Sequence, residues 1–190
     1  MKEILVETSA RHIHLTEADF KTLCGEDAQI EVRAPLSQPG QYVSTTRLDI
    51  VGPKRTLQNV SVLGPFRKDT QVEISLTDAR SIGVPGVIRE SGDIKGSAPV
   101  KLVGPKGEIE ISEGCIVAKR HIHMTSEDAK EFGITNGQIV MLELDTADRK
   151  VIFGDVVCRV RDDFALACHI DTDEANAANC SGKVFGKIIK

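Results

Sequence analysis

Short runs of alternating hydrophobic and polar residues recur along the chain, and most of them are rich in β-branched side chains. Glycine or proline bounds most runs, which is the pattern of strands joined by turns. Alternation puts every second side chain on one face of a strand, so one face of each strand can be buried. The predicted strands are 2–8, 47–51, 60–63, 70–75, 100–103, 108–111, 151–160 and 164–168.

Only a few short helices are predicted among these strands. Thr16 and Thr125 each precede acidic residues and a short helical segment, so both are predicted N-caps. Two more helices are predicted to start at the Thr-Asp pairs 77–78 and 172–173. Regular helices of 10–15 residues do not separate the strands, which disfavours a parallel doubly wound sheet. The predicted fold class is mainly β (α+β), with antiparallel strands and short helices.

The chain repeats itself. Residues 11–16 read Arg-His-Ile-His-Leu-Thr, and residues 120–125 read Arg-His-Ile-His-Met-Thr. A weaker match aligns the segment that begins at Glu73 with the segment that begins at His169. Self-similarity of this kind indicates duplication. We therefore predict two related halves, 1–95 and 96–190, and the first strand can pair with either half.

Composition narrows the class of protein. The 190 residues are 41% hydrophobic and 27% charged, as in globular proteins, and the net charge of −4 disfavours a nucleic-acid partner. No apolar run approaches the roughly 18 residues of a membrane span. The five cysteines are widely spaced and form no CxxC motif, which argues against a disulfide framework or a zinc finger. Reduced cysteines in the cytoplasm are the expectation.

The repeated histidine pairs, His12 with His14 and His121 with His123, carry the candidate chemistry. In an extended chain, residues i and i+2 point to the same side, so the two imidazoles of each pair converge. Converging imidazoles suit a divalent metal ion. One such pair occurs often by chance, but two intact copies at equivalent places favour metal binding.

The repeat also proposes a third ligand for each pair. His169 is the remaining histidine, and Glu73 is its counterpart in the first half. The simplest assignment joins His12 and His14 with Glu73; the alternative exchanges the third ligands between the halves. Three protein ligands leave an open coordination position, as in catalytic sites. Such donors suit Zn and also Co, Mn, Ni or Fe.

Two kinds of arginine accompany these ligands. Arg11 and Arg120 precede the histidine pairs and face away from the adjacent histidine in an extended chain, so each is predicted to brace a carboxylate. Arg67 precedes the strand that carries Glu73 and can hold two oxygens of a phosphate or carboxylate. An exposed loop arginine is the alternative for Arg67. Cys168 is predicted to be buried rather than nucleophilic.

Three segments together resemble the PduL-type phosphate acyltransferases, also called phosphate propanoyltransferases. They are 9–15 (SARHIHL), 63–67 with 70–73 (LGPFR and TQVE), and 118–124 (AKRHIHM). The similarity covers nearly the whole chain, with the motifs in the same order. It implies two β-barrels capped by short helices, and the reversible reaction of an acyl-CoA with phosphate to give an acyl phosphate and CoA.

The resemblance also implies the roles of individual residues. Two divalent metals, usually zinc, would lie on the two ligand sets, with the CoA sulfur as a further ligand at the first. Arg67 would be the catalytic, phosphate-binding residue. The candidate coenzyme contacts are Thr8, Ser9, Ala10, Lys54 and Asn176. The expected partners are small molecules, namely acyl-CoA or CoA with phosphate or acyl phosphate, and a homodimer is compatible with the sequence.

Family members packaged into bacterial microcompartments carry an N-terminal amphipathic segment, whereas few residues here precede the first motif. We therefore expect a free cytoplasmic enzyme, for which acetyl is an alternative to the propanoyl group of propanediol degradation. Two other classes stay open. One is a metal-dependent hydrolase of thioesters or phosphoesters that uses water as its nucleophile. The other is a metal- or ligand-sensing module without turnover.

Overall fold

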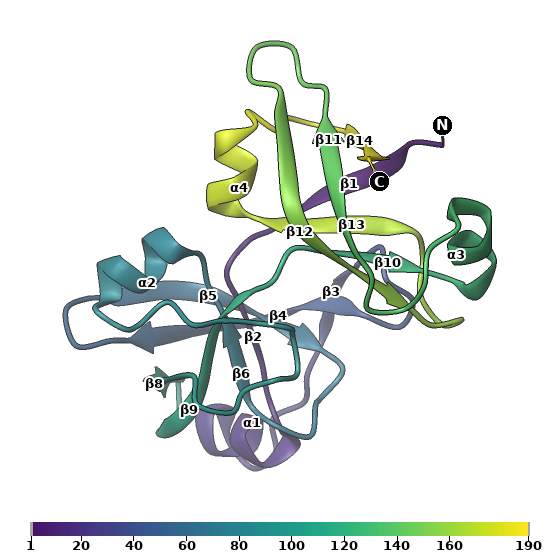
Figure 1. Cartoon of the computed structure of the whole chain (residues 1–190). Helices are drawn as coiled ribbons and strands as arrows, with labels where there is room; N and C mark the ends of the chain where they lie inside the picture. Colours follow the sequence, from purple (N-terminus) through teal and green to yellow (C-terminus); the bar gives the residue numbers. More distant parts are fainter. Residues whose placement is uncertain (1, 190) are drawn as a thin grey trace. The chain divides into compact units, whose positions relative to one another are not determined.

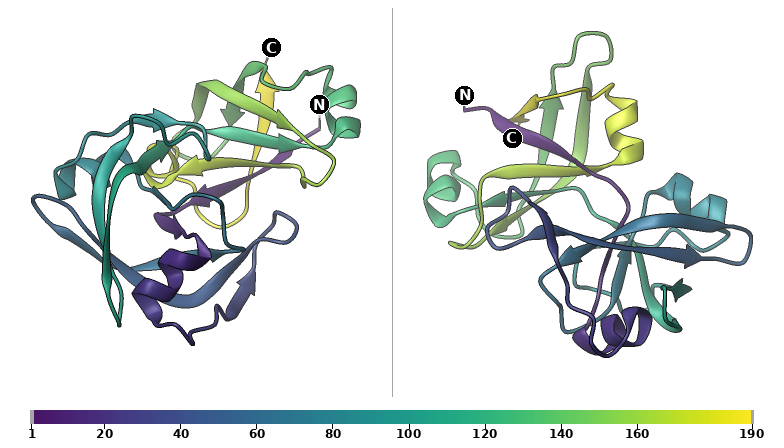
Figure 2. Two further views of the ribbon diagram at one scale, coloured as in Figure 1. Left: turned by 90° about the horizontal axis from the view of Figure 1, so that it is seen from below. Right: turned by 180° about the vertical axis from the view of Figure 1, so that it is seen from behind.

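The computed structural model describes residues 2–189, which form two compact units (Figures 1 and 2). We call residues 10–36 with 40–118 barrel A, and residues 2–9, 37–39 and 119–189 barrel B. Each unit contains one of the repeated histidine motifs and two of the four helices.

Barrel A is closed by six strands in the order β4-β5-β2-β6-β9-β8, because β8 pairs with both β9 and β4. Strands β3 and β7 extend the sheet beside β4 and β9. Its elements are β2 (His12–His14), α1 (Glu17–Cys24), β3 (Val32–Pro35), β4 (Tyr42–Val51), β5 (Thr56–Gly64), β6 (Gln71–Glu73), α2 (Leu76–Ile82), β7 (Ile88–Arg89), β8 (Ala98–Val103) and β9 (Glu108–Ala118).

Barrel B is closed by six strands in the order β11-β12-β10-β13-β1-β14, which matches barrel A strand for strand. Its elements are β1 (Ile4–Ser9), β10 (His121–Met124), α3 (Ser126–Phe132), β11 (Ile139–Leu144), β12 (Val151–Val160), β13 (Ala167–Asp171), α4 (Thr172–Ala177) and β14 (Val184–Ile189). The predicted pair of β-barrels with short helices is thus confirmed. Four of the six ladders in each barrel are antiparallel within residues 2–189; β2–β5, β6–β9, β10–β12 and β13–β1 are parallel.

The first strand of each repeat belongs to the barrel of the other repeat. Strand β1 precedes β2 in the chain but pairs with β13 and β14 in barrel B. Strand β9 precedes β10 but pairs with β6 and β8 in barrel A. The units therefore differ from the expected division 1–95 and 96–190. Residues 96–118 remain in barrel A, because β8 pairs with β4 and β9 pairs with β6.

The helices begin at capping residues, as predicted for Thr16 and Thr125. Each threonine hydroxyl accepts a hydrogen bond at 3.0 Å from the backbone N–H three residues later. The other two helices begin slightly before or at the predicted Thr-Asp pairs, with Ser75 and Asp171 as their N-caps. One strand is displaced from its predicted place. Strand β13 covers Ala167–Asp171 rather than 164–168, because the Phe164 N–H bonds back to Arg161 in a turn.

Both predicted arginine braces are present. Arg11 Nε lies 3.2 Å from an oxygen of Asp78 on α2, and Arg120 Nη1 lies 3.1 Å from an oxygen of Glu174 on α4. In both barrels, therefore, the arginine beside the histidine motif forms an ion pair with a carboxylate on a helix.

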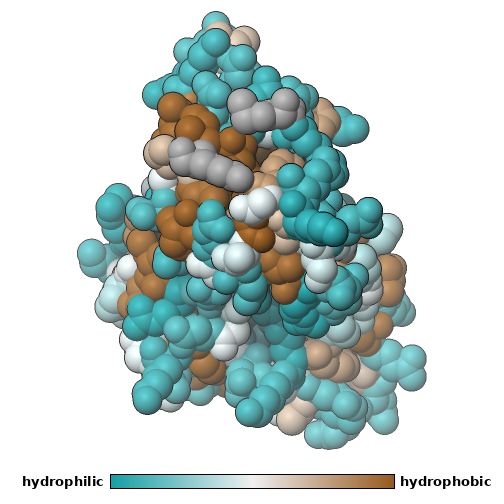
Figure 3. All heavy atoms as spheres, turned by 45° about the vertical axis from the view of Figure 1, so that its right-hand side comes forward, coloured by the Kyte–Doolittle hydropathy of each residue, from teal (hydrophilic) through white to brown (hydrophobic). Residues whose placement is uncertain are grey.

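Each barrel has its own apolar core, and the isoleucines between the paired histidines, Ile13 and Ile122, are fully buried in those cores. Other apolar side chains alternate to the outside, such as Ile139 and Met141 on β11. Figure 3 shows one face on which apolar and polar side chains are mixed. None of the helices in residues 2–189 is long and apolar enough to cross a membrane.

The exchanged strand makes a testable prediction. Ile4 on β1 is fully buried in the core of barrel B, so Ile4→Ala should reduce the free energy of unfolding by about 2–5 kcal/mol. Hydrogen exchange should quicken in β13 and β14 more than in β2, the next strand along the chain. The matched control is Ile152→Ala at a position 55% exposed in the same barrel, which should change stability little. Preferential loss of protection in β2 would contradict the exchange.

Candidate functional site

The first candidate site is built by the pairing of β2 with β6 in barrel A. His12 stands opposite Glu73 in this antiparallel ladder, and His14 is two residues along β2 on the same side. All three residues are buried, with exposed fractions of 6%, 3% and 7%. The register therefore brings together the three residues that the repeat had grouped.

The donor atoms of this cluster lie at spacings suited to a shared metal ion. His12 Nε2 is 3.5 Å from one Glu73 oxygen, and His14 Nε2 is 3.9 Å from the other. One ligand atom from each residue lies within 4.8 Å of those of the other two. His12 Nδ1 lies 2.8 Å from the Ala10 carbonyl, so it carries the proton and leaves a lone pair on Nε2. His14 Nδ1 is buried without a hydrogen-bond partner. Imidazole and carboxylate donors in this arrangement fit a divalent ion such as zinc.

Electrostatics within the cluster keep the carboxylate ionised. Burial would raise the pKa of Glu73, but His12, His14 and the hydrogen bond from Ser91 outweigh it and lower that pKa. Burial would lower the pKa of His12, and Glu73 reverses this and raises it. Burial, with the nearby His12 and Arg67, holds the pKa of His14 well below its usual value. The cluster thus offers a carboxylate and a neutral imidazole as donors.

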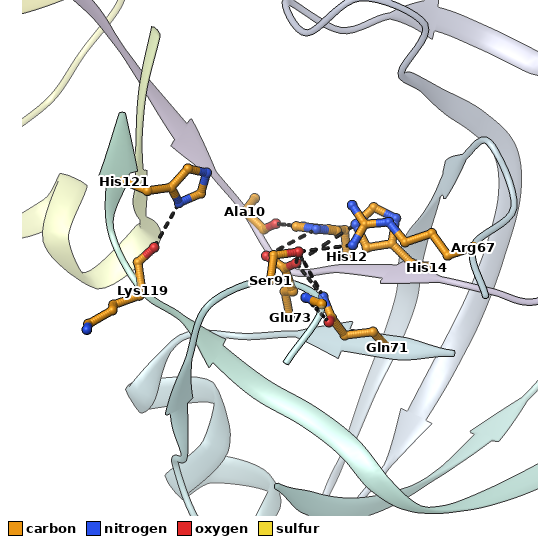
Figure 4. A network of polar contacts seen from close by, with 10 residues as sticks. Ala10, His12, His14, Arg67, Gln71, Glu73, Ser91, Lys119 and His121 are labelled. Carbon is orange, nitrogen blue, oxygen red and sulfur yellow. Dashed lines mark hydrogen bonds and ion pairs between the residues drawn. The ribbon is translucent and has the colours of Figure 1, made fainter. Parts of the chain in front are cut away.

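A polar network surrounds the cluster on the Glu73 side (Figure 4). Gln71 Nε2 and Ser91 Oγ each donate to Glu73 Oε1 at 2.6 Å, and Arg67 Nη1 donates to Ser91 Oγ at 3.0 Å. The half-buried Arg67 is held at its backbone by a bond of 2.8 Å from its N–H to the Leu15 carbonyl. The structure therefore places Arg67 half-buried beside the His12, His14 and Glu73 cluster rather than exposed in a loop.

Sequence reasoning missed Gln71 and Ser91. Alternation along β6 puts Gln71 on the same face as Glu73, so that pattern could have found it. Nothing local marks Ser91, which lies in a turn after β7. Only the tertiary fold brings that turn to the site.

The second candidate cluster lies within barrel B. His121 stands opposite His169 in the β10–β13 ladder, as His12 stands opposite Glu73. The ring centroids of His121, His123 and His169 are 4.6 to 5.3 Å apart. His121 Nδ1 lies 2.8 Å from the Lys119 carbonyl, and His123 Nδ1 is buried without a hydrogen-bond partner. Burial, with His121 and His169, lowers the pKa of His123 to about 2.

The two clusters differ in how closely their donor atoms converge. Within residues 2–189, the spacing of 4.8 Å or less is reached by His12, His14 and Glu73, and not by the three histidines of barrel B. A metal role for the second set therefore stays a prediction. Glu7, which sequence reasoning also missed, stands opposite His169 on β1. One of its oxygens is 3.8 Å from His169 Nε2 and accepts a hydrogen bond from Ser37.

The proposed coenzyme contacts are divided between the units. Thr8 and Ser9 end β1 in barrel B, where Ser9 pairs with Asp171, the N-cap of α4. Asn176 is exposed on α4, and Ala10 and Lys54 are exposed in barrel A. Their role toward a coenzyme stays a prediction.

Cys168 lies beside His169 but is fully buried, as predicted. Burial raises the pKa of its thiol far above the ordinary range, so a reactive thiolate is disfavoured. All five cysteines are free thiols.

The duplicated β-barrel carries a buried His-His-Glu cluster that could hold a metal ion, with an arginine beside it. A family model described as phosphate propanoyltransferase matches residues 5–181. The chain therefore belongs to the phosphate propanoyltransferase family. It is 53% identical to the phosphate propanoyltransferase of Levilactobacillus brevis, across 98% of this chain and 89% of that protein. It is 49% identical to that of Thermotoga maritima, across 92% and 83%, and 48% identical to that of Listeria monocytogenes, across 97% and 86%.

The clusters predict the metal content of two variants. His12→Ala and His121→Ala should each lose about one bound metal ion per chain, because each removes one of three donors. Elemental analysis of the purified variants measures this. Glu110→Gln, at an exposed position of β9, is the control and should keep its metal. Unchanged metal in both histidine variants would exclude two-site binding.

Proposed function

We propose that this chain transfers a short acyl group, propanoyl or acetyl, reversibly between coenzyme A and inorganic phosphate. The observation that carries the proposal is the buried His12, His14 and Glu73 cluster with Arg67 tied to it through Ser91. Membership of the phosphate propanoyltransferase family supports this type of reaction.

The reaction needs an oxygen of phosphate to attack the thioester carbonyl carbon. A new C–O bond forms, the C–S bond breaks, and the products are an acyl phosphate and the CoA thiolate. A divalent metal held by His12, His14 and Glu73 would supply Lewis-acid polarisation of the thioester and would stabilise the departing thiolate. Since sulfur is a soft ligand, zinc is the metal we propose.

The residues of barrel A supply the remaining requirements. His12, His14 and the ionised Glu73 are the donors that would hold the metal. Arg67 offers a planar fork of N–H groups that matches two phosphate oxygens and offsets their charge. Holding phosphate in a fixed orientation lowers the entropic contribution to the activation free energy of the attack on the thioester.

We propose further features of this enzyme. A second metal ion would lie on His121, His123 and His169 in barrel B. The coenzyme would contact Thr8, Ser9, Ala10, Lys54 and Asn176. We also propose a cytoplasmic location, where free thiols stay reduced, and a homodimer stays a prediction.

One assay tests the function against its alternatives. The purified protein is given acetyl-CoA or propanoyl-CoA with and without phosphate, and thiol release is followed with a thiol reagent. Phosphate-dependent release with accumulation of acyl phosphate is expected. Release of free acid in phosphate-free buffer would indicate the hydrolase instead. Tight metal binding without any thiol release would indicate a sensing module.

Arg67→Ala should raise the apparent KM for phosphate roughly ten- to hundredfold, because a charge-assisted hydrogen bond to the anion is lost. Metal content should stay at the wild-type level. Arg33→Ala, which removes an exposed arginine of β3 in the same barrel, is the control. Lower metal content with normal phosphate kinetics would refute the phosphate role.

Cys168→Ala should keep most of its turnover, because the thiol is buried and the phosphate oxygen attacks the thioester directly. Mass spectrometry of wild-type protein quenched during turnover should show no acyl group on this residue. A trapped acyl-enzyme at Cys168 would replace direct transfer by a two-step mechanism.

A further inference from the structure

The hydroxyl of Ser91 lies between the Arg67 guanidinium and the Glu73 carboxylate (Figure 4). It donates to Glu73 Oε1 at 2.6 Å and accepts from Arg67 Nη1 at 3.0 Å and from Gln71 Nε2 at 3.1 Å. A serine hydroxyl has one hydrogen and two lone pairs, so these three bonds use its whole capacity.

These bonds treat the two oxygens of Glu73 differently. Oε1 accepts from both Ser91 and Gln71, while Oε2 is the oxygen that lies 3.5 Å from His12 Nε2. Glu73 is 7% exposed, so water has little access to replace a missing bond. The network therefore fixes the rotation of the carboxylate and leaves Oε2 directed at the histidine beside it.

The turn that carries Ser91 is itself anchored to the site. The backbone N–H of Gly92 donates to Gln71 Oε1 at 2.7 Å, and the short strand β7 just before the turn pairs with β9. Gly92 has a φ of 99°, a conformation that favours glycine. These bonds anchor the backbone of the turn that carries Ser91.

We propose that Ser91 is a positioning residue that orients Glu73 toward the metal and Arg67 toward phosphate at the same time. The arginine half of this inference rests on the proposed function, whereas the carboxylate half concerns metal affinity alone. Partners that orient a metal ligand in this way commonly affect metal affinity or activity by roughly 10–100-fold when they are removed.

The test compares Ser91→Ala with Ser91→Thr, which keeps the hydroxyl, and with Ser81→Ala. The Ser81 hydroxyl donates to the Asp78 carbonyl within α2 at 2.8 Å, so Ser81→Ala removes a serine hydroxyl bond of the same barrel and is a matched control. Zinc affinity is measured by competition with a chromogenic chelator, in a His121→Ala background that removes the predicted barrel B site. Phosphate KM and kcat are measured in otherwise wild-type protein.

Ser91→Ala should bind zinc roughly 10–100-fold more weakly and raise the phosphate KM more than it lowers kcat. Ser91→Thr should restore most of both, and Ser81→Ala should resemble the wild type. Unchanged zinc affinity in a Ser91→Ala protein of normal melting temperature would overturn the proposal, as would equal damage in a stably folded Ser91→Thr protein. Absence of phosphate-dependent thiol release in the wild type would refute the proposed function, while the zinc measurement would still decide the role of Ser91.

Discussion

Closure of each barrel by a strand from the other repeat is the constraint on which the structure depends. Without β1, strands β13 and β14 would expose unpaired backbone groups, and without β9 the same would hold for β6 and β8. Unpaired edges are costly in a buried setting and prone to association in an exposed one. Each half of the sequence therefore needs a strand from the other half to close its barrel. The two repeats cannot form closed barrels independently of one another.

Barrel closure also fixes the strand ladders that hold the candidate ligands. Because β2 is paired on both sides, with β5 and β6, its register cannot slip without moving His12 and His14 to the wrong face. The buried Ile13 reinforces this choice from the opposite side of the strand. A site built on such ladders is more rigid than one built on loops, and the Ser91 turn and the segment with Arg67 between β5 and β6 come from outside the regular structure.

Duplication has given the two clusters the same backbone plan but different chemistry. In barrel A, a carboxylate faces the histidine pair, so the cluster carries a negative group that a metal or an arginine can balance. In barrel B, a third histidine takes that place, and burial, together with charge repulsion from His121 and His169, lowers the pKa of His123. Glu7 supplies the nearby carboxylate there from β1 instead. Equivalent positions in equivalent ladders therefore carry different sets of donor side chains.

The sequence by itself predicted the repeat, the strand class, the caps of two helices and, as the simpler of two alternatives, the grouping of Glu73 and His169 with the histidine pair of their own half. These features follow from local alternation, capping preferences and self-similarity, all of which are written along the chain. The tertiary structure alone decided the membership of residues 96–118 and the arrival of Ser91 and Glu7 at the two clusters. Those outcomes depend on pairings between strands that are far apart in sequence. Ser91 is a single serine in a turn, so no periodic pattern along the chain could have predicted its place in the site.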